Sequence, residues 1–287
     1  MPAGPLRDDR DVTPWPEPHG ELHALRSGDG GPTVVLVHGF TQTHVSWAPV
    51  AADLAADHRV LAVDAPGHGE SADIATDLAA GAARLGRVGS GAAGVGGESE
   101  RRAVYVGYSM GGRLALRLAL DRPELVAGLV LLGATAGIDD AAERAARRAG
   151  DEALADRIER DGVAAFLDVW LAQPLFADLR PTPDDLAARH ANAPSGLASS
   201  LRLAGTGTME PPWWDELPSM RVPTLVLAGE RDEKFTPLGH RLVDGIGPAA
   251  QFSTVPGTGH AAHLQEPMLV ANLVRRFAAS PSRRLSD

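Results

Sequence analysis

The sequence predicts an α/β fold built on a mostly parallel, doubly wound sheet, and three features carry this prediction. Residues 33–37 and 59–63 are continuous apolar and β-branched runs, the pattern of strands buried on both faces of a parallel sheet. Segments with helical spacing follow such runs, so strands and helices alternate. At residues 107–111, a serine fenced by glycines joins a strand-like run to a helix-like run. Because the 287 residues show no break in composition, we expect one large domain with an insertion.

The N-terminal half begins with a proline-rich stretch of mixed charge, residues 1–18, which we expect to be a disordered tail. A modest strand at 21–27 precedes the first buried run. Apolar residues at helical spacing predict helices over 46–57 and 74–85, on either side of the second buried run. Residues 86–98 consist mostly of Gly, Ala, Ser and Val, so we expect a flexible surface insertion without a chemical role.

The C-terminal half resumes the alternation and interrupts it once. Residues 137–216 have helical periodicity throughout, with prolines as breakers, and predict a helical cap inserted after the sixth strand. In a doubly wound sheet such an excursion lies above the carboxyl ends of the strands, where ligands bind. The core then comprises residues 19–136 and 217–287. Around the cap, strands are expected at 103–106, 126–132, 224–228 and 250–255, and helices at 110–120, 237–246 and 263–279.

Composition limits the partners of the protein. A net charge of −10 and a pI near 5.4 argue against nucleic acid or an anionic membrane surface, because both require a basic face. The lack of cysteine excludes disulfides and thiolate sites, and it fits a cytoplasmic protein. No apolar run approaches the roughly 18 residues of a membrane span, and no His and Asp residues have the spacing of metal ligands. We therefore expect no membrane insertion and no metal, and we attribute the lone lysine, Lys234, to base composition.

Ser109 is the residue around which the candidate site is organised. A side chain raised above a sheet edge on a tight strand-to-helix turn requires a strained backbone. Side chains two residues away on either side would collide with that turn, and Gly107 and Gly111 occupy those positions. The pattern is typical of a nucleophile elbow, with an ordinary glycine turn as the alternative.

An acid and an imidazole are expected after two later strands. A serine hydroxyl becomes reactive when an imidazole accepts its proton, and the imidazole needs a carboxylate that fixes its tautomer. In folds of this kind the acid and then the histidine follow the serine along the chain, and Asp232 and His260 stand at those places. Glu230 and Glu233 are neighbouring alternatives for the acid. His263 is expected to open the last helix as a cap or to contact a ligand.

Stabilisation of a developing oxyanion requires backbone N–H groups. We expect one from Met110, at a helix N-terminus, and one from Phe40, in the loop after the first buried strand. Arg113 lies one helical turn after the serine and shares its face. A guanidinium there can clamp a carboxylate, and the alternative is an arginine paired with a nearby Asp or Glu.

Several motifs resemble those of the α/β-hydrolase superfamily, namely residues 38–40, 64–71, 107–113, 229–235 and 259–267. Within the superfamily, the chain is most similar to the MenH family, the 2-succinyl-6-hydroxy-2,4-cyclohexadiene-1-carboxylate synthases of menaquinone biosynthesis. This narrower resemblance rests on the Gly-Tyr-Ser-Met-Gly-Gly-Arg motif and on residues 143–148, 170–176 and 229–235. It extends from about residue 21 to about residue 277, and the tail and the glycine-rich insertion have no counterpart in it.

The resemblance implies an α/β-hydrolase fold that performs a lyase reaction instead of hydrolysis. The family removes a proton from a cyclohexene dicarboxylate that carries an enolpyruvyl group and expels pyruvate, which leaves a conjugated cyclohexadiene. Ser109, activated by His260 and Asp232, then acts as a base. No organic cofactor or metal is implied. The partner is a small polyanionic dicarboxylate substrate, which explains why an acidic protein keeps arginines at its pocket.

Five residues match substrate contacts of the family by motif position: Tyr108, Arg113, Arg147, Trp170 and Arg189. The match of Arg189 requires a short gap. Trp170 has the alternative of a core aromatic in the cap, and Arg147 that of a solvated helix face.

Two other functions stay open. An ester or carbon–carbon bond hydrolase of the same fold would use Ser109 to attack a carbonyl. The second alternative is a binding protein of this fold without catalytic activity. The presence of Ser109, Asp232 and His260 together argues against this alternative. Arg113 and Arg147 favour an anionic substrate over a neutral ester.

Overall fold

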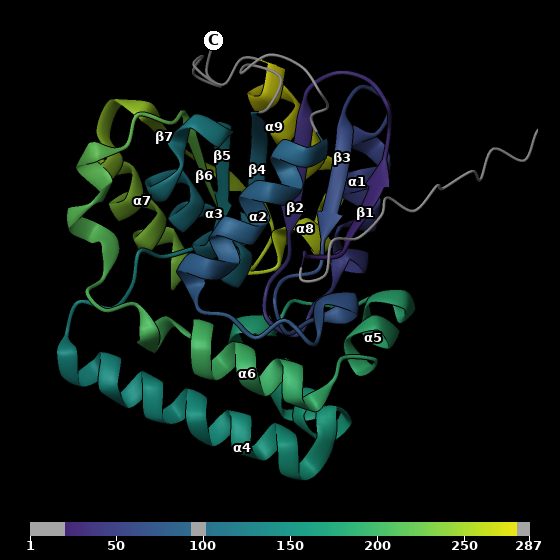
Figure 1. Cartoon of the computed structure of the whole chain (residues 1–287), viewed down its shortest axis with the longest axis vertical. Coiled ribbons are helices and arrows are strands. Elements are labelled where there is room, and N and C mark those ends of the chain that lie inside the picture. The colour runs from purple at the N-terminus through teal and green to yellow at the C-terminus, as the bar shows by residue number, and fades with distance from the viewer. Residues whose placement is uncertain (1–20, 93–101, 280–287) are drawn as a thin grey trace, which may run out of the picture.

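The computed structural model describes residues 21–92 and 102–279, so the predicted tail and part of the glycine-rich insertion lie outside the described residues. One seven-stranded sheet runs through this part in the order β1-β3-β2-β4-β5-β6-β7 (Figure 1). Strand β1 is antiparallel to its neighbour and the other pairs are parallel. The predicted α/β fold is therefore confirmed. The strands are β1 Ala24–Ser27, β2 Thr33–Val37, β3 Arg59–Val63, β4 Ala103–Tyr108, β5 Val126–Leu132, β6 Thr224–Gly229 and β7 Ala250–Val255.

Helices cover both faces of the sheet (Figure 1). Leu85 and Leu118 are fully buried on one face, and Leu54 and Phe277 are fully buried on the other. Because both faces are covered, the central strands contain apolar residues in unbroken runs, which is why their sequence pattern located them. The layers consist of α2 Leu78–Ala92, α3 Met110–Asp121 and α7 Phe235–Ile246 on the first face, and of α1 Ala48–Leu54 and α9 Pro267–Ala279 on the second.

Helix α2 corrects the expectation of a flexible insertion from residue 86. The helix continues to Ala92, and the remainder of the predicted insertion lies outside the described residues. A Cβ on Gly86 would lie 2.8 Å from Leu118 Cδ1, and one on Gly89 would lie 2.1 Å from the Tyr105 hydroxyl oxygen. These glycines let the helix approach α3 and β4 closely, so a composition that suggested flexibility serves close packing here.

Three helices interrupt the alternation between β5 and β6, and we call them the cap helices: α4 Ala141–Leu171, α5 Pro183–His190 and α6 Pro194–Ala204. They lie together below the sheet in Figure 1. Among the described residues they follow the fifth strand, so the expected insertion after the sixth strand is wrong by one. A single antiparallel strand, β1, precedes β2 in this part of the chain. The exact boundaries of the cap, 137–216, stay a prediction.

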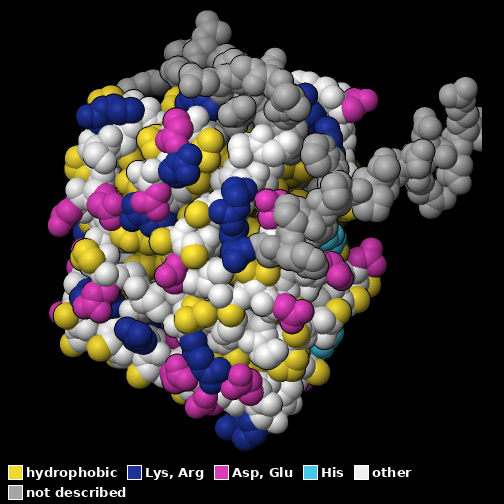
Figure 2. Space-filling model, viewed as in Figure 1, with side chains coloured by type: hydrophobic (Ala, Val, Ile, Leu, Met, Phe, Trp, Pro, Cys, Tyr) yellow, Lys and Arg dark blue, Asp and Glu magenta, His cyan; other side chains and the backbone are white. Residues whose placement is uncertain are grey.

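The cap helices have an apolar core of their own. Ile158 and Phe166 of α4 pack against Leu197 and Leu201 of α6. On the outer side, Arg202 of α6 bonds with three carboxylates of α4, and Figure 2 shows acidic and basic side chains intermixed over this region. Helices α4 and α6 are therefore joined on both sides and form one layer.

The closing segment divides into two helices where we expected one. The short helix α8, Ala262–Gln265, ends before Pro267, which begins α9. Proline lacks an N–H group and so cannot continue the preceding helix. None of the helices in the described ranges combines the length and the apolar character that crossing a membrane requires.

Candidate active site

The backbone at Ser109 turns sharply from strand β4 into helix α3. Ser109 has φ of 50° and ψ of −108°, in the region that residues with a side chain rarely adopt. A Cβ on Gly107 would lie 2.4 Å from the carbonyl oxygen of Gly111, and one on Gly111 would lie 2.3 Å from that of Val37. Neither position has room for a side chain, so the structure has the strained, glycine-flanked turn that the sequence predicts.

Two loops at the ends of later strands bring an imidazole and a carboxylate to the serine. His260 Nε2 lies 3.4 Å from Ser109 Oγ, and His260 Nδ1 lies 2.7 Å from Asp232 Oδ2. Asp232 Oδ1 accepts a 3.0 Å hydrogen bond from the Phe235 amide, which fixes the carboxylate. Serine–histidine contacts of this length commonly tighten when substrate binds. The set can move a proton from the serine to the imidazole while the carboxylate holds the tautomer.

The neighbouring alternatives do not reach the imidazole. Glu230 is exposed and accepts a hydrogen bond from a loop amide, and Glu233 is exposed as well. The expectation for His263 is wrong, because this residue lies inside α8, after the helix start, and does not line the cavity described below. It is fully buried between the rings of Trp47 and Tyr108, at centroid distances of 4.4 and 4.3 Å. Burial lowers the pKa of His263 well below its ordinary value, so a neutral ring packs there.

A cavity opens at Ser109 between the sheet and the cap helices, and we call it the inner cavity. The space in and at the mouth of this cavity that holds no protein atoms, open solvent included, amounts to about 790 Å³. Asp232 stands behind His260 and does not line it. All the other residues that the sequence analysis selected do: Phe40, Tyr108, Ser109, Met110, Arg113, Arg147, Trp170, Arg189 and His260. Folding thus collects residues from both halves of the core and from the cap at one serine.

The two residues selected for their amides lie beside the serine. Met110 is the first residue of α3, where the helix dipole contributes partial positive charge. Phe40 lies in the loop after β2, and Thr41, next to it, has a strained φ of 69°. The cap holds this loop, because Asn192 donates a 2.9 Å hydrogen bond to the Thr41 carbonyl and Arg189 donates one of 2.7 Å to its hydroxyl. The position of the loop therefore depends on the cap.

Arg113 and Arg147 bring positive charge to one side of the inner cavity. Arg113 is buried, its Nη1 donates a 2.7 Å hydrogen bond to the Ala204 carbonyl, and no described carboxylate lies within ion-pair distance. Burial and the charge of Arg147 lower the pKa of Arg113 to about 10. Arg147 is 37% exposed and pairs with Asp151 at 2.9 Å. Burial raises the pKa of Asp151 although both arginines oppose this. Asp151 is thus paired with Arg147 alone, and its charge acts on Arg113 from beyond ion-pair distance.

Arg189 lies on another wall of the cavity, on helix α5, and is 2% exposed. Its Nε donates to Asp185 Oδ2 at 2.7 Å and its Nη1 donates to the Thr41 hydroxyl. Its Nη2 is buried and has no hydrogen-bond partner among the described residues. A buried donor without a partner costs roughly 1–3 kcal/mol, so this nitrogen fits an acceptor oxygen supplied by a ligand.

Aromatic rings form the remaining wall. Trp170 stacks on Phe166 at a centroid distance of 5.6 Å and faces the edge of Phe40 at 5.2 Å. Its Nε1 is buried without a hydrogen-bond partner in the described part of the chain. Tyr108, 3% exposed, has its pKa raised by burial, so it stays a neutral phenol. Flat apolar walls thus stand beside cations in this cavity.

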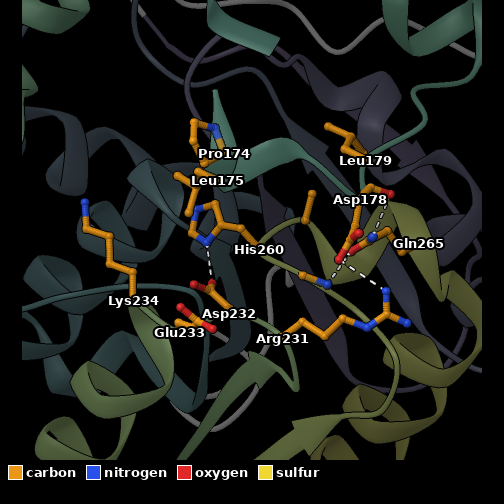
Figure 3. Close-up of a pocket in the computed structure, with 12 residues that line it drawn as sticks. Pro174, Leu175, Asp178, Leu179, Arg231, Asp232, Glu233, Lys234, His260 and Gln265 are labelled. Atoms are coloured by element: carbon orange, nitrogen blue, oxygen red, sulfur yellow. Dashed lines mark hydrogen bonds and ion pairs between the residues drawn. The ribbon is translucent and has the colours of Figure 1, made fainter. Parts of the chain in front are cut away.

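Lys234, whose presence we attributed to base composition, also lies at the site. Lys234 lines the inner cavity and also a neighbouring outer cavity, drawn in Figure 3, and His260 and Leu175 line both as well. Partial burial of the ammonium and the charge of Arg147 lower the pKa of Lys234, although Asp232 opposes this. The signal that could have revealed it is its position, two residues after the predicted acid.

Folding also assembles a trio of potential metal ligands that sequence spacing did not reveal. Ligand atoms of His23, His44 and Asp64 lie within 4.8 Å of one another, outside the inner cavity. The Asp64 oxygens accept hydrogen bonds from both imidazoles at 3.0 Å, and from the His44 and Glu70 amides at 2.7 and 3.1 Å. Because N–H donors already occupy this carboxylate, the trio is a hydrogen-bonded anchor for the loop after β3.

Comparisons with known proteins agree with this architecture. The chain matches the alpha/beta hydrolase family over residues 34–273. It is 36% identical to a Bacillus subtilis protein provisionally named 2-succinyl-6-hydroxy-2,4-cyclohexadiene-1-carboxylate synthase, over 88% of this chain and 93% of that protein. It is 34% identical to the Klebsiella pneumoniae protein of that name, over 90% of this chain and 98% of that one.

Among solved structures, MenH from S. aureus is similar, with a TM-score of 0.82 and 27% sequence identity. The superposition covers 91% of this chain and 99% of that structure. The likeness therefore includes the cap helices as well as the sheet.

Proposed function

The chain belongs to the alpha/beta hydrolase family, and we propose that within it the protein is a 2-succinyl-6-hydroxy-2,4-cyclohexadiene-1-carboxylate synthase of menaquinone biosynthesis. It is then a carbon–oxygen lyase. Its substrate is 2-succinyl-5-enolpyruvyl-6-hydroxy-3-cyclohexene-1-carboxylate, from which it eliminates pyruvate to leave the conjugated diene. Relatives of that name, matched over nearly their whole length, support this reading.

The observation that carries the proposal is the charge around the serine. Four cationic side chains line the inner cavity of a protein with a net charge of −10: Arg113, Arg147, Arg189 and Lys234. Desolvation of cations costs free energy, and a neutral ester offers nothing that offsets it. The substrate carries carboxylates on its ring, its succinyl group and its enolpyruvyl group, and each can form charge-assisted hydrogen bonds. The charge of the site therefore favours the lyase over an ester hydrolase.

The reaction requires a base at one carbon and no attack on a carbonyl. The ring double bond moves from position 3 to positions 2 and 4, so the proton that leaves comes from C2, next to the succinyl ketone. Ser109 removes it as its own proton passes to His260, and Asp232 stabilises the imidazolium. Electrons of the C2–H bond form the C2–C3 double bond, those of the old double bond form C4–C5, and the C5–O bond breaks. Pyruvate leaves as its enol form and takes up the proton.

The oxyanion donors act on the ketone beside C2. Loss of the C2 proton places negative charge on the ketone oxygen, and the amides of Met110 and Phe40 stabilise that charge. One such donor typically contributes roughly 2.7–4 kcal/mol to the transition state. An oxyanion hole of the kind that hydrolases use thus stabilises an enolate here, in place of a tetrahedral intermediate.

The remaining selected residues bind the substrate. Arg113 and Arg147 bind a substrate carboxylate on one side of the inner cavity. On the other side, Arg189 can donate a hydrogen bond from its unpartnered Nη2 to a second carboxylate. Tyr108 and Trp170 pack against the ring between them. Binding at several points holds C2 at the serine oxygen, and such positioning is a large part of catalysis.

Two substrates test the proposal together. Purified protein is incubated with the enolpyruvyl cyclohexene and, separately, with a p-nitrophenyl ester, while pyruvate and p-nitrophenol are followed. We expect pyruvate from the first at a rate far above ester turnover. Rapid ester hydrolysis without pyruvate would assign the site to a serine hydrolase, and neither activity would assign it to a binding protein.

A further inference from the structure

Lys234 stands at the boundary between the two cavities. It lines the inner cavity with the serine and the outer cavity with Asp232, and it is the only lysine in the sequence. Figure 3 shows its side chain on the opposite side of His260 from the Asp178, Arg231 and Gln265 group. Its ammonium is therefore separate from the polar group that closes the far side of the outer cavity.

The cations of the inner cavity differ in what they contact. Arg113 donates to a carbonyl, Arg147 pairs with Asp151 and Arg189 pairs with Asp185. For Lys234, the structure gives a contact with the Phe235 ring at 5.4 Å, and no carboxylate within ion-pair distance among the described residues. Lys234 is thus a cation of the site that forms no ion pair with a described carboxylate.

Arg147 and Lys234 lie close enough for their charges to repel. The charge of Arg147 contributes to the lowered pKa of Lys234, and Arg147 has a single carboxylate partner, Asp151, which it shares with Arg113. Asp151 therefore acts on two arginines at once, and the carboxylate that attracts Lys234, Asp232, is already bonded to His260. An anion between Arg147 and Lys234 removes the repulsion and gains attraction from both sides.

We propose that Lys234, together with Arg147, binds the enolpyruvyl carboxylate of the substrate at the boundary of the inner and outer cavities. The proposal rests on the function proposed above. Lys234 is exposed, and a hydrated ammonium on a flexible stem holds a carboxylate less rigidly than a buried arginine fork does. That suits the group that departs as pyruvate, whereas Arg113 and Arg189 are buried and suit the carboxylates that remain on the ring.

Kinetics of Lys234→Gln test this assignment against a matched control. We expect kcat/KM for the substrate to fall about 10- to 150-fold, the loss of a charge-assisted hydrogen bond. The inhibition constant of the cyclohexadiene product should stay unchanged, because the product lacks the enolpyruvyl carboxylate. Lys234→Arg should restore most of the activity. The control is Arg231→Gln, which removes an exposed cation paired with Asp178 that lines only the outer cavity, and it should behave as wild type.

Two kinetic results would overturn the assignment. Equal weakening of substrate and product binding would place Lys234 at a carboxylate of the ring or make its role structural. An unchanged kcat/KM in Lys234→Gln would remove it from the site altogether.

Nuclear magnetic resonance of the single lysine provides a second test that does not depend on turnover. Protein labelled with ¹³C-lysine gives one ε-methylene signal, whose pH titration reports the pKa of Lys234. Saturating pyruvate should raise that pKa and shift the signal, and Arg147→Gln should raise it without pyruvate. A titration that pyruvate leaves unmoved would contradict the proposal. Failure of wild-type pyruvate release would instead contradict the proposed function, so the two failures are distinct.

Discussion

Replacing Arg189 by methionine separates its binding role from its structural one. Arg189 is buried on α5, pairs with the buried Asp185 at 2.7 Å and donates to the loop that carries Phe40. Methionine keeps an unbranched stem about as long as that of arginine up to Nε, and it removes the charge and all donors. The unpartnered Nη2 is lost with them, and Asp185 is left as a buried carboxylate without its cation.

Two costs of different origin follow from this substitution. Truncation of one member of a buried charge pair costs about 2–5 kcal/mol in binding, which corresponds to roughly a 30- to 5,000-fold loss of kcat/KM. Leaving Asp185 buried and unpaired lowers the free energy of unfolding by about 3–5 kcal/mol. Both values are measurable, the first from pyruvate release and the second from urea unfolding.

A double variant, Arg189→Met with Asp185→Asn, decides between the two roles. Removal of the stranded carboxylate should restore most of the unfolding free energy, because neutral replacements of a buried pair are well tolerated. The loss in kcat/KM should persist, since no donor faces the substrate. Recovery of kcat/KM together with stability would refute the reasoning and reduce Arg189 to a structural residue.

Three further predictions concern the proton path, the opposite wall and acid stability. Ser109→Ala should lower kcat for pyruvate release about 10²- to 10⁴-fold with unchanged folding by circular dichroism; near wild-type turnover would exclude it as the base. Arg113→Ala should cost about 2–5 kcal/mol in kcat/KM, and unchanged kinetics would show that its contact with the cap carbonyl is its whole role. Burial lowers the pKa of His38 to about 4 and that of His68 to about 3, so the folded protein binds fewer protons than the unfolded chain below the ordinary histidine value. As the pH falls from about 6.5 to about 4, each histidine should therefore lower the free energy of unfolding by roughly 1.4 kcal/mol per pH unit. A free energy of unfolding that urea titrations show to be constant over this range would contradict the prediction.

Much of the fold could be read from apolar runs alone. Strands β2, β3 and β5 lie at the predicted residues, because a parallel sheet covered on both faces demands unbroken apolar segments. The turn at Ser109 was predictable for a different reason, since its geometry excludes side chains at Gly107 and Gly111. Patterns that depend on local sterics are visible in the sequence.

Features that depend on distant partners were missed. Lys234 becomes significant only beside Arg147, which lies on another element nearly ninety residues earlier, and the trio around Asp64 comes from three separate segments of the chain. The glycines of α2 looked flexible because the neighbours they approach, Tyr105 and Leu118, are not adjacent in sequence. Composition cannot distinguish a glycine that loosens a chain from one that permits close packing.

The mass of the ring product distinguishes elimination from hydrolysis. Elimination and hydrolysis of the enolpyruvyl group both release pyruvate, but elimination breaks a ring C–H bond and leaves a diene, whereas hydrolysis adds water and leaves an alcohol. We expect one cyclohexadiene per pyruvate from the wild-type protein, and almost none from Ser109→Ala. A ring product heavier by one water would contradict it, because the serine site would then be that of a hydrolase.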